Sequence, residues 1–369
     1  MIPVNEPVIS KEAKANVLAA LDSGWLSSAG PFVKQFEKEF AEYLGVKHAI
    51  TATSGTAALH LALLSLGIGK DDEVIVPAFT MAASWMAVLY VDAKPVFVDC
   101  ELETFNIDPQ KIELKITPKT KAIMPVHIYG HACDMDAVLT IAKKHNLMVI
   151  EDAAEVLGGK YKNQLCGSFG EINCFSFYAN KILATGEGGM VVTNRDDVAE
   201  KVRKYKDLYH SDKKRFIHEG IGFNYRMSNL QAAVGLGELK HLNEYLQKKR
   251  WMAEQYSEGL KNIPGIKTPR TKPEVENTYW MYGILIDKER FGMSRDELKA
   301  RLKACGIDTR DFFYPPQDQP VLKAILGKEE FPCAKYLSEN GLYLPSGLAL
   351  TEKQIQTVIS SIKNLSKYD

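Results

Sequence analysis

The sequence predicts an α/β protein in which a mainly parallel sheet is covered by helices on both faces. Short apolar runs of strand type, such as residues 73–77 and 147–150, are separated by helix-like segments, such as 135–146. These runs are apolar at almost every position, which is typical of strands buried on both faces. A chain of 369 residues is also long enough to bury a large core and to form two domains.

In chain order, the N-terminal half begins with two expected helices, at residues 10–23 and 31–44, and the second carries aromatic residues at helical spacing. A mostly apolar helix is expected at 56–66. The strands expected to form the sheet are residues 73–77, 95–99, 122–126, 147–150, 172–177 and 189–193.

In the C-terminal part, one long helix is expected over residues 229–262, ended by Pro264 and Gly265. A strand at 282–286 and helices at 294–305 and 351–365 follow it. We place a domain boundary near residue 245, inside the long helix. The expected domains are therefore a large α/β domain over residues 1–245 and a smaller α+β domain over 246–369.

Composition and charge narrow the classes of partner. Acidic and basic residues number 46 each, so no overall field favours nucleic acid or an anionic membrane. The N-terminus lacks the pattern of a signal peptide, and no apolar stretch is long enough to span a bilayer. The six cysteines form no CxxC pair, which favours reduced thiols in the cytoplasm.

The sequence does not predict a metal site. His127 and His131 are four residues apart, but Tyr129 and Gly130 lie between them and a strand-like run precedes them, so a shared helical face is not expected. The chain also has no HExxH motif.

Three segments supply an amine, a carboxylate and an anion-binding turn. Lys181 follows an apolar strand and precedes a glycine-rich turn, and Asp152 ends another apolar strand. Ser54-Gly55-Thr56 opens a helix, where free amides and the helix dipole favour an anion. Taken singly, these are an ordinary surface lysine, a loop acid and a helix cap. Together they suit pyridoxal 5′-phosphate (PLP), which needs a lysine for a Schiff base, an acid beside its pyridine nitrogen and a phosphate site.

The same residues resemble the DegT/DnrJ/StrS family of sugar-nucleotide aminotransferases, a branch of the fold-type I PLP enzymes. The matching motifs run through nearly the whole chain and occur at residues 3–7, 24–28, 53–59, 76–80, 126–130, 151–155, 175–190, 222–227 and 313–315. The resemblance implies the fold-type I architecture, with the mainly parallel sheet sandwiched by helices and a smaller C-terminal α+β domain.

The resemblance also implies roles for individual residues. Lys181 would carry the cofactor, Asp152 would pair with the pyridine nitrogen, and Ser176 would help the helix start to hold the phosphate. Asn224 would reach the phosphate site of the other subunit, which implies a homodimer with shared active sites. The cofactor residues implied in full are Ser54, Gly55, Thr56, Met81, Trp85, Asp152, Glu155, Ser176, Lys181 and Asn224. The implied substrate residues are Trp25, Ser27, Tyr178, Arg226, Phe313, Tyr314 and Gln317.

Two positions depart from the family pattern. Met81 stands where many relatives have an aromatic residue over the pyridine ring, so either Met81 packs on the ring or Trp85 replaces it. Gln317 stands where relatives often carry histidine, in a segment that helps to hold the sugar nucleotide.

Glu155, with Asn180 before the lysine, most resembles the branch that aminates C4 of GDP-4-keto-6-deoxy-D-mannose to give GDP-perosamine. The expected reaction is ping-pong, with L-glutamate as amino donor and Lys181 as the proton carrier.

An aminotransferase acting on a dTDP- or UDP-linked 4-keto sugar is an alternative. A sugar 3-dehydratase of this fold would carry histidine in place of Lys181. A non-catalytic regulator would need a DNA-binding element, and we find neither a helix-turn-helix pattern nor a basic patch.

Overall fold

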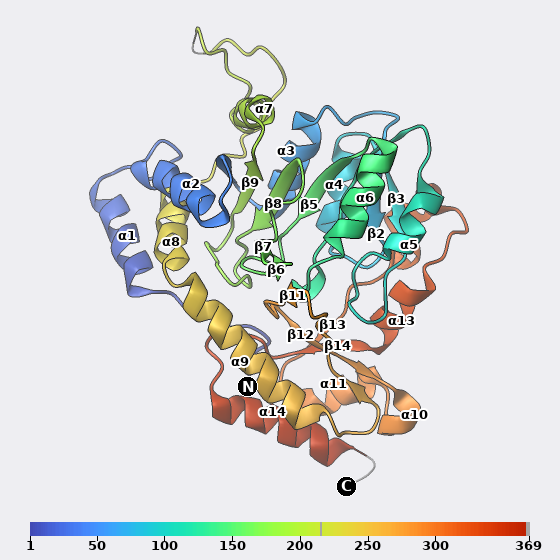
Figure 1. Cartoon of the computed structure of the whole chain (residues 1–369). Coiled ribbons are helices and arrows are strands. Elements are labelled where there is room, and N and C mark those ends of the chain that lie inside the picture. Colours follow the sequence, from blue (N-terminus) through green and yellow to red (C-terminus); the bar gives the residue numbers. More distant parts are fainter. Residues whose placement is uncertain (215, 367–369) are drawn as a thin grey trace.

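A computed structural model describes residues 1–214 and 216–366 and contains a central seven-stranded sheet (Figure 1). The strand order is β1-β9-β8-β5-β4-β2-β3. Adjacent strands from β8 to β3 are parallel, and β9 is antiparallel to both of its neighbours. The predicted fold class, a mixed and mainly parallel sheet flanked by helices, is confirmed. The strands are β1 (His48–Ala52), β2 (Glu73–Pro77), β3 (Lys94–Val98), β4 (Thr120–Ile123), β5 (Met148–Asp152), β8 (Ile172–Ser176) and β9 (Gly189–Thr193).

Helices cover the two faces because of the order of the strands. The crossover from β2 to β3 moves in one direction along the sheet, and the crossover from β4 to β5 moves in the other. Right-handed crossovers therefore place α4 (Ala82–Tyr90) and α6 (Met135–His145) on opposite faces (Figure 1). The other helices of this part are α1 (Lys11–Asp22), α2 (Pro31–Leu44), α3 (Gly55–Ser65) and α7 (Asp196–Lys206).

The expected long helix over residues 229–262 is two helices, which corrects that prediction. Helix α8 (Asn229–Leu239) begins with a capping box between Ser228 and Gln231, and α9 (Leu242–Leu260) follows after a break. At the break His241 has a ψ of 2°. The imidazole of His241 lies 2.8 Å from Glu12 of α1 and 3.2 Å from Glu244. The contact with Glu12 connects the break to α1.

The C-terminal part contains a four-stranded antiparallel sheet in the order β10-β12-β14-β13. Apolar side chains of α9 belong to two clusters: Tyr245 and Leu246 pack into the large core, whereas Met252 and Tyr256 pack with the C-terminal sheet. The domain boundary near residue 245 stays a prediction. The elements here are β10 (Ile266–Lys267), β12 (Tyr282–Ile286), β13 (Arg310–Asp311), β14 (Gly341–Leu344), α10 (Lys288–Phe291), α11 (Arg295–Ala304), α12 (Lys323–Leu326), α13 (Pro332–Asn340) and α14 (Glu352–Leu365).

Short elements complete the chain: α5 (Pro109–Ile112), β6 (Lys160–Tyr161), β7 (Gln164–Leu165) and β11 (Val275–Glu276). Strand β11 pairs with β6, so the segment before β12 joins a separate three-stranded sheet, in the order β11-β6-β7, with strands that lie between β5 and β8 in the chain. Within the described residues, no helix has both the length and the apolar character needed to cross a membrane. All six cysteines are free thiols.

Candidate active site

A cavity of about 400 Å³ lies at the carboxyl ends of β5 and β8, where open α/β sheets bind their ligands. The amine, the carboxylate and the helix start singled out in the sequence all line it. Four residues that follow α9 in the chain also line the cavity, on the side away from the sheet: Trp280, Arg310, Phe313 and Tyr343. The predicted residues in the wall are Ser54, Gly55, Thr56, Met81, Asp152, Glu155, Ser176, Tyr178, Lys181 and Phe313, and the residues not predicted there are Leu59, Thr80, Ala83, Val126, Ala154, Asn180, Glu187, Trp280, Arg310 and Tyr343.

Lys181 lies in the loop between β8 and β9. Its Nζ is 3.4 Å from the centre of the Trp280 ring, and the Trp280 indole donates a 2.8 Å hydrogen bond to the carbonyl of Asn180. Burial lowers the pKa of Lys181, although the charges of Glu155 and Asp152 partly oppose this decrease. A larger fraction of the amine is therefore unprotonated, and so nucleophilic, than for a lysine in water.

Asp152 ends β5 and is 3% exposed. Its Oδ2 accepts a 2.8 Å hydrogen bond from the hydroxyl of Ser84 on α4, and its Oδ1 accepts a 3.1 Å bond from the amide of Ala154. Burial raises the pKa of Asp152, and both hydrogen bonds oppose that increase. The carboxylate is thus held in one orientation. Because it is poorly solvated, a cationic partner would stabilise its charge.

Glu155 is a second buried carboxylate in the same wall. Its Oε2 accepts a 2.8 Å hydrogen bond from the backbone amide of Tyr129. Burial raises the pKa of Glu155, while the charge of Lys181 lowers it. Tyr129 has a φ of 53° and Gly130 a φ of 102°, so this loop turns sharply where its amide meets the carboxylate.

The start of α3 forms an anion cradle. Ser54 caps the helix through Ala57, and the other first-turn amides are free of intrahelical partners. A Cβ at Gly55 would lie 2.8 Å from the Cβ of Ser176, so only glycine lets β8 approach this closely. The approach brings the hydroxyl of Ser176 beside the helix start, where helix amides and dipole stabilise an anion. A lysine, a buried acid and this cradle in one cavity fit PLP.

Met81 and Trp85, the two candidates for packing on the ring of the cofactor, lie in different environments. Met81 lines the cavity and is 54% exposed, whereas Trp85 is 3% exposed and packs in the core along α4. The described wall of the cavity does not include Trp85. The prediction that Trp85 replaces the missing aromatic is therefore not supported by its position, and Met81 is the residue that faces the cavity.

Several predicted residues lie outside this cavity. Asn224 accepts a hydrogen bond from Arg226, which also forms a 2.8 Å ion pair with Asp207. Trp25 is exposed in the loop after α1, where its carbonyl accepts a hydrogen bond from Asn229. These positions leave their predicted roles untested, because Asn224 is expected to act on another subunit.

Three other predicted substrate residues also lie elsewhere: Tyr314 and Gln317 are in the C-terminal part of the chain, and Ser27 follows α1. Tyr314 is 52% exposed. Gln317 is half-buried, and its side chain donates to the carbonyl of Phe331. Ser27 uses its carbonyl to accept a hydrogen bond from the amide of Asn229. None of the three is in the described wall of the cavity.

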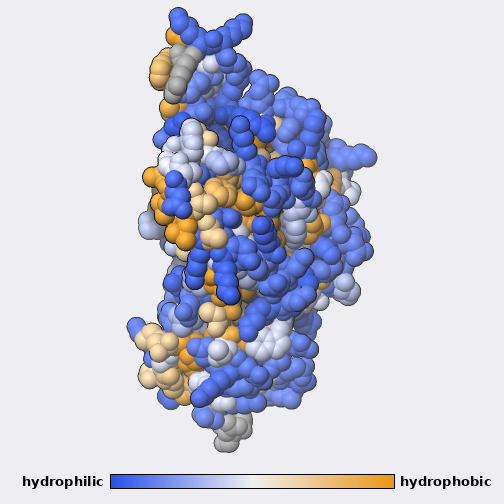
Figure 2. Space-filling model, turned by 90° about the vertical axis from the view of Figure 1, so that its left-hand side faces the viewer, coloured by the Kyte–Doolittle hydropathy of each residue, from blue (hydrophilic) through white to orange (hydrophobic). Residues whose placement is uncertain are grey.

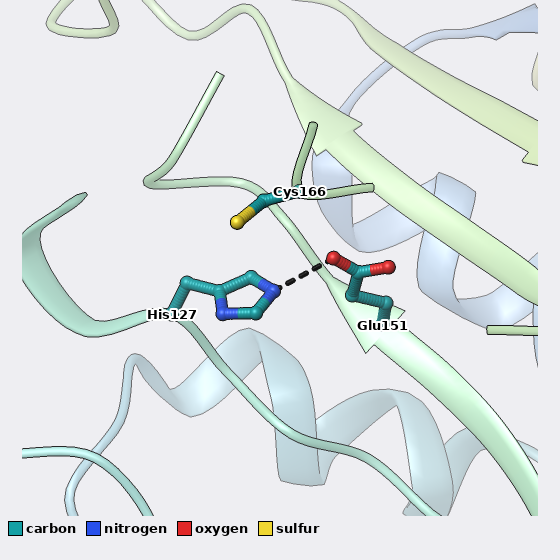
Figure 3. A group of neighbouring side chains, drawn as sticks. All are labelled: His127, Glu151 and Cys166. Atoms are coloured by element: carbon teal, nitrogen blue, oxygen red, sulfur yellow. Dashed lines mark hydrogen bonds and ion pairs between the residues drawn. The ribbon is translucent and has the colours of Figure 1, made fainter. Parts of the chain in front are cut away.

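His127, Glu151 and Cys166 form a buried cluster (Figure 3). His127 Nδ1 accepts from the amide of Cys133, so the proton is on Nε2, which donates a 2.8 Å bond to Glu151. Glu151 also accepts from the amides of Gly167 and, at 2.9 Å, Phe169. Because the His127 and Glu151 ligand atoms already have partners, we assign this cluster a structural role: it ties two loops to β5, next to Asp152.

A family model, curated sequences and solved structures were found to be similar to this chain. The model of the DegT/DnrJ/EryC1/StrS aminotransferase family matches residues 7–363. GDP-perosamine synthase of Caulobacter vibrioides is 44% identical over 365 residues, which cover 98% of this chain and 97% of that protein. The X-ray structure of S. venezuelae DesV is 35% identical with a TM-score of 0.91, covering 99% of this chain and 100% of that one. Spr1654 from Streptococcus pneumoniae in its PLP form is 28% identical with a TM-score of 0.93, covering 99% and 98%.

Proposed function

This chain belongs to the DegT/DnrJ/EryC1/StrS aminotransferase family, and on that premise we propose that it transfers an amino group from L-glutamate to C4 of GDP-4-keto-6-deoxy-D-mannose. The product is GDP-perosamine. The observation that carries the proposal is the single cavity shared by Lys181, Asp152 and the start of α3. The choice of nucleotide sugar is supported by the similarity to the Caulobacter protein, whose name states that product.

The residues of the cavity fit PLP, which when bound supplies an electron sink for charge developing on the amino-acid α-carbon. Lys181 is the attachment point, because it is the amine in the wall with a lowered pKa. Asp152 would pair with the pyridine nitrogen of bound PLP, and its negative charge would keep that nitrogen protonated. The amides at the start of α3, with the hydroxyls of Thr56 and Ser176, hold the phosphate.

Lys181 would also carry the proton that moves during the reaction. Its Nζ accepts the proton from the α-carbon of glutamate and later returns one to the aminated sugar. Both duties need an amine that can give up and take up a proton, and burial favours the unprotonated form by lowering the pKa of Lys181. The Trp280 ring lies against Nζ, with its centre 3.4 Å away, and covers one side of the amine.

We also propose that the enzyme is a homodimer whose active sites are shared. Figure 2 looks at the side where α1 lies and shows hydrophobic surface among the polar atoms. The exposed apolar residues around α1 are Val8, Ile9, Leu18, Leu21, Trp25 and Leu26. A second copy covering this face would remove them from water, and Asn224 would reach the phosphate of the partner site. The six free thiols suit the reducing cytoplasm, where we place the enzyme.

The first experiment identifies the cofactor and the substrate. Protein loaded with PLP is reduced with borohydride and digested, and the pyridoxyl label is expected on Lys181. Glutamate is then supplied with a panel of GDP-, dTDP- and UDP-linked 4-keto-6-deoxy sugars, and the amino sugar is measured by mass spectrometry. A label on another lysine would reject the assignment of Lys181, and preference for a dTDP- or UDP-linked sugar would reject the GDP-linked substrate.

The second experiment tests the shared site. Inactive Lys181→Ala subunits are mixed with inactive Asn224→Asp subunits, in which the new carboxylate repels the phosphate. If sites are shared, each mixed dimer has one site with both changes and one with neither, so activity partly returns. If mixed dimers are confirmed by native mass spectrometry and no activity returns, each site is built from one chain.

A further inference from the structure

Arg310 is a cation in the cavity wall that has no carboxylate partner within residues 1–214 and 216–366. Arg226 and Arg295, by contrast, form ion pairs, with Asp207 at 2.8 Å and with Asp311 at 2.9 Å. The backbone of Arg310 is fixed by the C-terminal sheet, because Arg310 on β13 lies directly opposite Tyr343 on β14 in the antiparallel register. A guanidinium that lines a cavity and has no carboxylate partner among the described residues is suited to bind an anion.

Tyr343 adds a second donor beside Arg310. Its side chain lines the same cavity and is 7% exposed. Burial raises the pKa of Tyr343, and the neighbouring charge of Arg310 only partly opposes that increase. The hydroxyl therefore stays protonated at neutral pH and is able to donate to an anion held by Arg310.

The cavity is otherwise unfavourable for an anionic ligand away from the phosphate cradle. Asp152 and Glu155 are buried carboxylates in its wall, and Glu187 is a third acidic residue there. An incoming carboxylate is repelled by these groups unless a cation faces it. Arg310 supplies that cation from the opposite wall, which is formed by the C-terminal part of the chain.

We propose that Arg310, with Tyr343 beside it, binds the α-carboxylate of the amino donor. The inference rests on the proposed function. The α-carboxylate is bonded to the carbon that loses its proton to Lys181, so it must lie in the cavity that contains Lys181. A planar carboxylate also matches the two parallel N–H groups of a guanidinium.

The other anion in the reaction is the diphosphate of the nucleotide sugar. It is attached to C1 of the pyranose ring, across the ring from the reacting C4. When C4 is at the cofactor, the diphosphate therefore points out of the cavity of about 400 Å³. An arginine that lines the same cavity as Lys181 is better placed for the carboxylate than for the diphosphate.

The experiment compares Arg310→Gln and Arg310→Lys with Arg270→Gln as a matched control. Arg270 is exposed, pairs with Glu103 at 3.0 Å and lies outside the cavity. PLP-loaded proteins are titrated by calorimetry with glutarate, a dicarboxylate that has no amine to react, and separately with GDP. Arg310→Gln is expected to weaken glutarate binding roughly 10- to 100-fold. Arg310→Lys should lose less, because a point charge keeps the attraction without the bidentate geometry. Arg270→Gln should bind glutarate as the unchanged protein does.

A kinetic measurement distinguishes an effect on binding of the donor carboxylate from an effect on binding of the nucleotide diphosphate. The rate of the absorbance change on adding glutamate alone reports the donor half of the reaction, and amination of the nucleotide sugar by enzyme pretreated with glutamate reports the acceptor half. Arg310→Gln is expected to raise the glutamate KM and to leave GDP binding within twofold. Weakened GDP binding with normal glutarate binding, or no change in either, overturns the proposal. If Arg310→Gln does not fold, the same outcomes are read from Arg310→Lys.

The design also distinguishes this inference from the proposed function. Glutarate binding that depends on Arg310 supports the carboxylate site even if no GDP-linked sugar is aminated. Amination of the GDP-linked sugar with glutarate binding indifferent to Arg310 supports the proposed function and overturns the inference.

Discussion

Replacing Lys249 with methionine is expected to change how stability depends on pH. Lys249 lies on α9, is 2% exposed, and donates hydrogen bonds to the carbonyls of Ser346 and, at 2.8 Å, Trp280. Burial lowers the pKa of this lysine from 10.5 to about 7. Methionine has similar length and no proton to lose, so Lys249→Met removes the titration while filling most of the space.

The sign follows from the number of protons bound in each state. Between pH 7 and 10.5 the unfolded chain keeps a proton on Lys249 that the folded chain has released. The free energy of unfolding contributed by this group therefore rises with pH in that window, and the full penalty of burying the amine is present below pH 7. The slope is about 1.4 kcal/mol per pH unit, or at most about 5 kcal/mol over the window.

Urea unfolding at pH 7, 8 and 9 provides the assay. Other groups titrate in the same range, so the useful quantity is the difference in unfolding free energy between the unchanged protein and Lys249→Met. That difference should move in favour of the lysine by about 1 kcal/mol or more for each pH unit. Parallel stability curves would refute the reasoning, since they would mean that the two carbonyls stabilise the ammonium and keep its pKa near that of a lysine in water.

Three further predictions concern the cavity. Asp152→Asn should keep the fold and the PLP but lose roughly two to three decades in turnover, because the amide has no charge to hold the pyridine nitrogen protonated; near-normal turnover would make this acid structural. Gly55→Ala should weaken PLP binding at least several-fold by equilibrium dialysis, because its Cβ would press on Ser176 at 2.8 Å, and unchanged affinity would argue against the cradle. Trp280→Leu should lower the pKa of Lys181 further, because the ring that stabilises the ammonium by about 1 kcal/mol is lost; the pH dependence of reductive methylation of Lys181 in the PLP-free protein measures this, and an unchanged or higher value would contradict it.

Much of the large sheet could be predicted because its strands are uniformly apolar. Strands β2, β5, β8 and β9 were expected close to where they lie. Strand β1 was not, since its residues follow α2 without a clear pattern and become a strand by pairing with β9. The division between α8 and α9 was missed for a similar reason, because contacts of His241 with Glu12 decide it and the helical periodicity continues across it.

The candidate site shows the same division between local and distant causes. Asp152 and Lys181 could be singled out because the first ends, and the second comes shortly after, a strand of recognisable type. Ser84 carried no local signal, since its importance comes from a hydrogen bond to a residue 68 positions away. Trp280 and Arg310 lie beyond α9, and only the packing of the C-terminal part onto the sheet brings them to the cavity.

The contact between Trp280 and Lys181 gives the protein an optical reporter of its own. Of the four tryptophans in the sequence, Trp280 is the one in the described wall of the cavity. Its ring centre is 3.4 Å from the amine to which PLP is proposed to attach. A chromophore attached there would lie within range of efficient energy transfer from the indole, so ultraviolet-excited emission should fall as the cofactor binds. Occupancy of the site is then readable in real time without any added label.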